Sequence, residues 1–77
     1  MEYLATFFTH YGAMKFHKYC GLAGIPSKMA PVPRGLSASC GVCVRFEAES
    51  IPESAGHEDM ERCYIVLSSG DYAPAEG

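Results

Sequence analysis

The apolar residues of the first third of the chain predict a strand followed by a helix. Tyr3–Phe8 is rich in aromatic and aliphatic side chains, as in a central strand that is buried on both faces. Thr9 can cap a helix, and Gly24 followed by Pro26 can end one. Between these ends, apolar residues recur at steps of three and four, which places them on one helix face: Ala13, Phe16, Cys20 and Ala23.

Three further extended segments follow the helix. Ser27–Val32 reads as a strand whose prolines at its end confine it to a sheet edge or a departing loop. Val42–Phe46 alternates between apolar residues and the pair Cys43 and Arg45, and Arg62–Leu67 is a last strand. The helix should join the first two strands as a right-handed βαβ unit with parallel strands. The short connection to the third strand predicts antiparallel pairing with the second.

This order of elements predicts an α+β fold, the ferredoxin-like split βαβ sandwich, with its second helix shortened. The shortening follows from residues 47–61, which hold six acidic side chains together with Pro52 and Gly56 and read as a solvated loop with at most a short helical turn. One helix can leave part of the apolar face of a four-stranded sheet uncovered. We therefore predict a partner chain or a homodimer there.

Length and composition limit the chain to one domain. Its 77 residues are 48% hydrophobic and 19% charged, which excludes the disordered class. We assign residues 1–67 to the domain. Residues 68–77 are mostly Gly, Pro, Ala and acid, so we expect a flexible tail.

Charge is divided unevenly along the chain. Residues 1–46 hold five basic and one acidic side chain, whereas residues 47–77 hold one basic and eight acidic ones. The basic residues are few and scattered, which excludes a nucleic-acid-binding surface. The first eight residues lack a basic region, and no apolar run reaches membrane-spanning length, so we expect a cytoplasmic protein without a membrane partner.

Cys40 is the candidate reactive residue. It lies where a small polar loop meets the apolar run that begins at Val42. Nearby cations and open backbone amides lower a cysteine pKa from about 8.5 and so favour the nucleophilic thiolate. Arg34 and Arg45 flank Cys40 and Gly41 follows it, so we predict that these residues bind and activate the sulfur.

The other cysteines leave alternatives open. Cys40 and Cys43 form a CxxC, so Cys43 could act as a resolving thiol, although positions three apart in a regular strand face opposite sides. Cys20 and Cys63 read as buried small hydrophobes. A zinc site commonly needs two such pairs, and the residues around His57 form no metalloprotease motif, so we expect no metal and no cofactor.

The segment Pro31–Phe46 resembles the putative selenium/sulfur carrier protein-like family. The likeness lies in Pro-Val-Pro-Arg at residues 31–34, Leu-Ser-Ala-Ser-Cys-Gly at 36–41 and Arg-Phe at 45–46. It covers roughly residues 3–46, and more loosely Tyr64–Val66. The resemblance implies a carrier rather than an enzyme, which holds sulfur or selenium on Cys40 as a persulfide or selenosulfide.

Three functions follow from these observations. In the first, Cys40 accepts sulfur or selenium from a donor protein such as a cysteine desulfurase, the arginines stabilise the charged adduct, and an acceptor protein receives it. In the second, Cys40 and Cys43 form the redox pair of a thiol oxidoreductase or sensor. In the third, the domain is an interaction module without chemistry.

Overall fold

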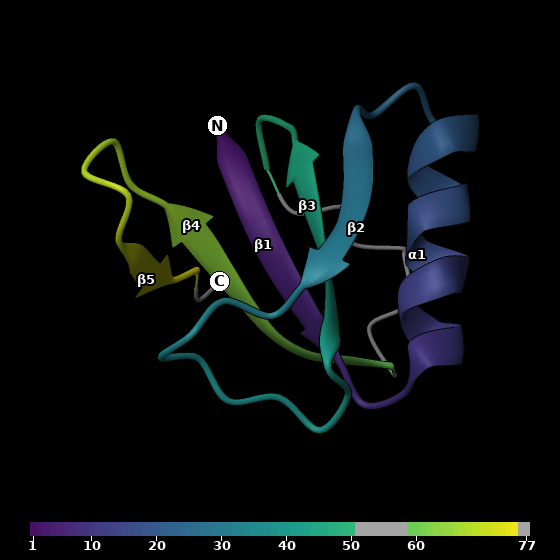
Figure 1. Cartoon of the computed structure of the whole chain (residues 1–77). Helices are drawn as coiled ribbons and strands as arrows, with labels where there is room; N and C mark the ends of the chain where they lie inside the picture. The colour runs from purple at the N-terminus through teal and green to yellow at the C-terminus, as the bar shows by residue number, and fades with distance from the viewer. Residues whose placement is uncertain (51–58, 76–77) are drawn as a thin grey trace.

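One helix packs against one face of a five-stranded antiparallel sheet (Figure 1), so the fold is α+β. The computed structural model of the chain describes residues 1–50 and 59–75. The elements follow one another along the chain as β1 (Glu2–Phe7), α1 (His10–Leu22), β2 (Ser27–Pro31), β3 (Val42–Glu47), β4 (Met60–Val66) and β5 (Tyr72–Pro74).

The strand order is β2-β3-β1-β4-β5, and every neighbouring pair is antiparallel. The predicted antiparallel pairing of the second and third strands is confirmed. Because β1 and β2 are both antiparallel to β3, they run in the same direction and β3 lies between them. The loop between β2 and β3 extends past the end of the sheet at which β1 finishes (Figure 1).

The two ends of α1 have the caps that the sequence predicts. The Oγ1 of Thr9 accepts a hydrogen bond from the Gly12 amide at 3.0 Å. At the other end, Gly24 has a φ of +75°, and the amide of Ile25 donates to the carbonyl of Cys20 at 2.8 Å. The predicted apolar stripe is correct except at Ala23, which is the exposed C-cap residue.

The core on the helix side of the sheet is an aromatic cluster centred on Phe16. The Phe16 ring meets the Phe46 ring edge to face, with 5.0 Å between centroids, and lies 5.5 Å from the Phe7 ring. Tyr3 in turn stacks on Phe46 at 5.2 Å. Aromatic pairs of this geometry contribute about 0.5–1.5 kcal/mol each beyond the burial of their area. The cluster therefore attaches α1 to β1 and β3.

The centre of the sheet is buried on both faces. Along β1, Tyr3, Ala5 and Phe7 belong to the core beside the helix. Leu4 and Thr6 alternate with them, so they point to the opposite face, and both are also fully buried. This confirms the prediction that the first strand is central.

The sequence predicted no strand in residues 68–77, which were expected to be flexible, but Tyr72–Pro74 pair with β4. A tight hairpin makes this pairing possible: the Leu67 amide donates to the Asp71 carbonyl, and the Gly70 amide donates to the Leu67 carbonyl. Gly70 has a φ of +92°, as the last residue of a three-residue hairpin loop requires.

The predicted acidic loop over residues 47–61 is described only in part. The segment 51–58, which holds Pro52 and Gly56, lies outside the described residues. The last predicted strand begins at Met60, two residues before the predicted start. Among the described residues, α1 packs against β1, β2 and β3, and the predicted partner chain or homodimer over the remaining face stays a prediction.

The described part of the chain contains no helix that is both long and apolar enough to cross a membrane.

Replacing Phe16 should remove much of the stability of the domain. Phe16→Ala deletes a side chain that is 1% exposed, and such deletions cost about 3–5 kcal/mol through lost burial and the cavity left behind. The matched control on the same helix is Leu22→Ala, where the side chain is 82% exposed and the change should stay within about 0.5 kcal/mol. Urea unfolding followed by circular dichroism measures both, and equal losses in the two variants would contradict this description of the core.

Candidate functional site

The Cys40 loop, residues 32–41 between β2 and β3, is closed at its base by a hydrogen bond and makes a tight turn near its start. The Val32 amide donates to the Gly41 carbonyl at 3.1 Å, which joins the two ends of the loop. The Leu36 amide donates to the Pro33 carbonyl at 3.2 Å, and Gly35 within this turn has a φ of +99°. Arg34, one of the predicted site residues, therefore lies exposed at a turn of the Cys40 loop.

Cys40 lies at the far end of this loop and is half-buried. Its Sγ is 3.8 Å from the carbonyl oxygen of Val42, close to the start of β3. The residue before it, Ser39, makes two hydrogen bonds to Glu61 of β4, from the backbone amide at 2.9 Å and from the hydroxyl at 3.1 Å. The sequence predicted the position of Cys40 at the junction of loop and strand, but it did not single out Glu61.

Cys43 has a different environment from Cys40. Its side chain is fully buried, and its Sγ is 3.6 Å from the carbonyl oxygen of Pro31. Burial raises the pKa of the Cys43 thiol, and the positive charge of Arg45 offsets part of that rise. The two cysteines of the CxxC thus contact different carbonyl groups, and both are free thiols in this structure.

The remaining cysteines are sheltered by the core. Cys20 is fully buried on α1, and burial raises its pKa. Cys63 is half-buried on β4, where burial raises its pKa to about 11. Both side chains are therefore neutral thiols at neutral pH, and they pack as small hydrophobic residues do.

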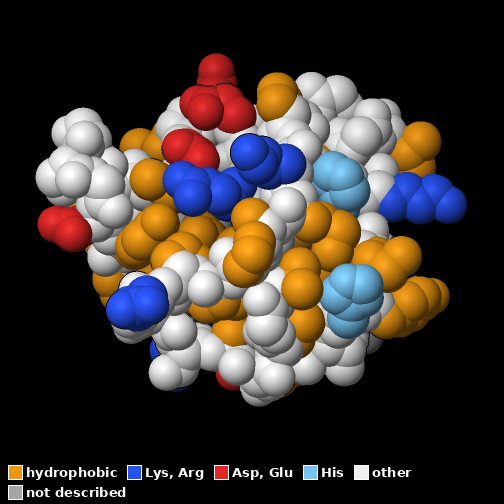
Figure 2. All heavy atoms as spheres, viewed as in Figure 1, with side chains coloured by type: hydrophobic (Ala, Val, Ile, Leu, Met, Phe, Trp, Pro, Cys, Tyr) orange, Lys and Arg blue, Asp and Glu red, His pale blue; other side chains and the backbone are white. Residues whose placement is uncertain are grey.

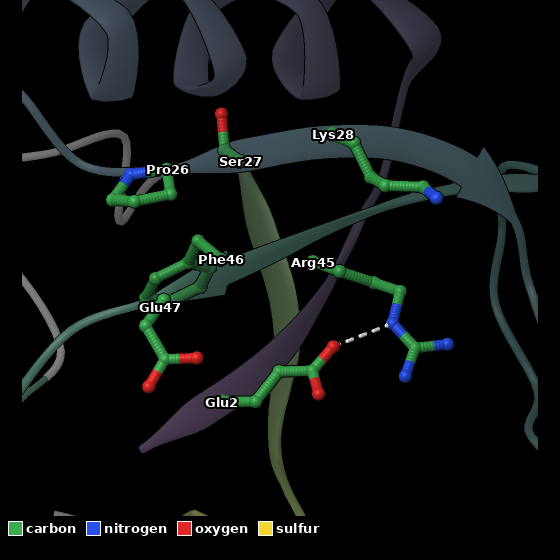
Figure 3. A pocket seen from close by; sticks show the side chains of 7 residues that line it. All are labelled: Glu2, Pro26, Ser27, Lys28, Arg45, Phe46 and Glu47. Carbon is green, nitrogen blue, oxygen red and sulfur yellow. Dashed lines mark hydrogen bonds and ion pairs between the residues drawn. The ribbon is translucent and has the colours of Figure 1, made fainter.

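Arg45 is engaged by a carboxylate. Its Nε lies 2.9 Å from Oε2 of Glu2, and this hydrogen bond is the main cause that raises the pKa of Arg45, with a further contribution from Tyr72. Arg45 and Glu2 lie beside a hollow of about 230 Å³, which Lys28 also lines. Figure 3 shows these side chains, with the contact between Arg45 and Glu2 dashed. Arg45 lies three residues into β3, so its Cα is about 10 Å along the strand from Val42. Its predicted role beside Cys40 stays a prediction.

Gly41 contributes its carbonyl to the base of the loop. It is exposed, and a Cβ built on it would meet no atom within 4 Å. The predicted role of its backbone amide toward the Cys40 sulfur stays a prediction.

Within residues 1–50 and 59–75, no three His, Cys, Asp or Glu side chains are grouped so that they could hold a metal ion. His17 is occupied by a hydrogen bond between its Nδ1 and the Oγ of Ser27 at 2.7 Å. His57 lies outside the described residues.

Basic and acidic side chains lie next to one another on the face shown in Figure 2, beside a broad area of hydrophobic side chains. The predicted absence of a nucleic-acid partner stays a prediction.

The chain matches the model of a known protein family. Residues 2–59 match a family model described as "Putative Se/S carrier protein-like". The matched segment includes the whole Cys40 loop and ends before Glu61. Comparisons with curated proteins and with solved structures give no match.

The four thiols should differ in their reaction with iodoacetamide. In the folded protein at pH 8, Cys40 should be labelled first. Cys20 and Cys43 should be labelled last because they are fully buried, and Cys63 should be slow because a pKa of about 11 leaves about 0.1% thiolate. Peptide mass mapping during the reaction measures the order, and all four should react alike in urea. Labelling of Cys43 as fast as that of Cys40 would contradict the geometry described above.

The shape of the loop should depend on Gly35 more than on Gly41. A Cβ on either glycine would meet no atom within 4 Å, so the two differ mainly in backbone conformation. At Gly35 the φ of +99° should make Gly35→Ala cost about 1–2 kcal/mol, because L-residues rarely adopt this region. Gly41→Ala should be nearly neutral. Urea unfolding of the two variants checks this, and equal losses would speak against a turn that requires glycine.

Proposed function

Because the chain belongs to the putative Se/S carrier protein-like family, we propose that it carries sulfur or selenium on Cys40. The observation that carries this proposal is the contrast among the four thiols. Cys40 is the cysteine that a loop presents at the end of the sheet, whereas Cys20 and Cys43 are fully buried and Cys63 has a strongly raised pKa. A sulfur carrier needs a thiol that a partner can reach.

The transfer proceeds by attack of the Cys40 thiolate on the outer sulfur of a persulfide on a donor protein. A new S–S bond forms between Cys40 and that sulfur, while the S–S bond of the donor breaks and its electron pair stays on the donor thiolate. Cys40 then holds the persulfide, and no external oxidant or reductant is consumed. The same exchange with a donor selenosulfide leaves selenium on Cys40.

The partners in this proposal are a donor such as a cysteine desulfurase and an acceptor protein, all in the cytoplasm. Arg34 is exposed at a turn of the same loop, where it can meet an acidic patch on a donor. Arg45 is paired with Glu2, so Arg34 has the freer charge for stabilising the anionic terminal sulfur.

The second function, a redox pair of Cys40 and Cys43, has less support from the geometry. A resolving cysteine must reach the other sulfur as a thiolate, and Cys43 is fully buried with a raised pKa. The Sγ of Cys43 contacts the carbonyl of Pro31, whereas that of Cys40 contacts the carbonyl of Val42.

The finer fold assignment belongs to the same proposal. The connection of β1 to β2 through α1, with β3 between the two strands and β4 on the other side of β1, supports a ferredoxin-like split βαβ domain. The second helix of such a domain would fall in the segment 51–58, which lies outside the described residues. β5 is an addition at the edge of that arrangement.

The proposal predicts a mass gain that depends on Cys40. After incubation with a cysteine desulfurase and cysteine, the intact protein should gain one sulfur mass that a reductant removes. The gain should disappear in Cys40→Ser and persist in Cys43→Ser, which serves as the matched control because it keeps the reactive thiol. Intact-mass spectrometry measures both.

A loss of two hydrogens that requires both cysteines would instead support the redox pair. If the mass of the wild-type protein does not change and Cys40 is alkylated slowly, an interaction module without chemistry would remain as the function.

A further inference from the structure

A break in the pairing of β1 and β4 puts Glu61 out of register. Thr6 lies opposite Arg62, but the next residue, Phe7, lies opposite Met60. Glu61 is therefore an extra residue on β4 without a partner on β1, which is the arrangement of a β-bulge. A bulge redirects the side chain of its extra residue, and bulges are frequent beside functional sites.

The start of β4, directly before the bulge, is fixed to the beginning of α1 through Asp59. The carbonyl of Asp59 accepts a hydrogen bond from the Phe8 amide at 3.0 Å, and its carboxylate pairs with Lys15 at 2.8 Å. Asp59 also packs against Gly12 so closely that a Cβ at residue 12 would lie 2.7 Å from the Asp59 Cβ. These contacts hold the chain in place just before it reaches Glu61.

The redirected carboxylate of Glu61 binds the residue next to Cys40. Its Oε1 accepts a hydrogen bond from the Ser39 amide, with 2.9 Å between N and O, and its Oε2 accepts one from the Ser39 hydroxyl, with 3.1 Å between the two oxygens. The backbone hydrogen bonds of the loop at Leu36 and at Val32 stay within the loop or close its base. Among the described residues, the Glu61 pair thus joins the loop to another strand of the sheet.

We infer that Glu61 is a positioning residue for Cys40. By holding both donors of Ser39, it keeps the end of the loop in the geometry from which the thiol meets the persulfide of a donor protein. The attack requires the three sulfur atoms to align, so loss of this hold lowers the fraction of productive encounters. The inference rests on the proposed function for the transfer reaction, but not on the family match, which ends before Glu61.

The test compares Glu61→Ala with Arg62→Gln, a change at the exposed neighbouring position. The rate of sulfur uptake from a persulfidated cysteine desulfurase should fall roughly three- to tenfold in Glu61→Ala, the range that one exposed hydrogen-bonded pair supports. In Arg62→Gln it should stay within about twofold. Ser39→Ala keeps the hydrogen bond from the backbone amide to Glu61, so its rate of sulfur uptake should fall less. The double variant, with both Ser39→Ala and Glu61→Ala, should take up sulfur no more slowly than Glu61→Ala alone.

Alkylation of Cys40 by iodoacetamide separates positioning from a general loss of structure. A released loop exposes the thiol to a small reagent, so Glu61→Ala should react roughly threefold or more faster than Arg62→Gln, while its melting temperature stays close to that control. Uptake and alkylation rates equal to those of Arg62→Gln would overturn the inference.

Failure of the proposed function gives a different result. If the wild-type protein takes up no sulfur, the carrier proposal fails, and the alkylation rates alone decide the role of Glu61. Faster alkylation of Cys40 in Glu61→Ala would then still support positioning, and an unchanged rate would overturn it.

Discussion

The packing of Phe16 against Phe46 is the contact on which the rest of the structure depends. Phe16 belongs to the only described helix and Phe46 to the strand that begins directly after the Cys40 loop, so this edge-to-face pair connects the two. With Phe46 placed against the helix, the alternation of β3 sends Cys43 and Arg45 to the opposite face. The face of the sheet on which Cys43 lies therefore follows from a contact made three residues further along β3, at Phe46.

Much of this arrangement can be read from the sequence because its signals are local. The helix was predicted with both caps, since Thr9 and Gly24 have side chains or backbone freedom suited to those positions. The four longer strands were predicted from their apolar runs, with small differences at their ends. β5 was missed because three residues without a clear apolar pattern depend on the hairpin at Gly70.

The surroundings of Cys40 were less accessible to sequence reasoning. Its position at the junction of loop and strand, where it is half-buried, follows from a local feature of the sequence. Glu61 could not be recognised, because it lies 21 positions away in an acidic run that reads as a solvated surface, and only the bulge in β4 brings it to Ser39. Arg45 is close to Cys40 in sequence, yet pairing of β1 with β3 brings Glu2 to it and provides its partner.

The two outer strands of the sheet each contain a proline: Pro31 in β2 and Pro74 in β5. Proline has no amide hydrogen to donate, and an unprotected strand edge invites backbone pairing with other chains and aggregation. Lys28 adds a charge to the β2 edge, which further disfavours pairing of this edge with a strand of another chain. At high concentration, the sheets of different copies should therefore resist joining edge to edge into a continuous intermolecular sheet.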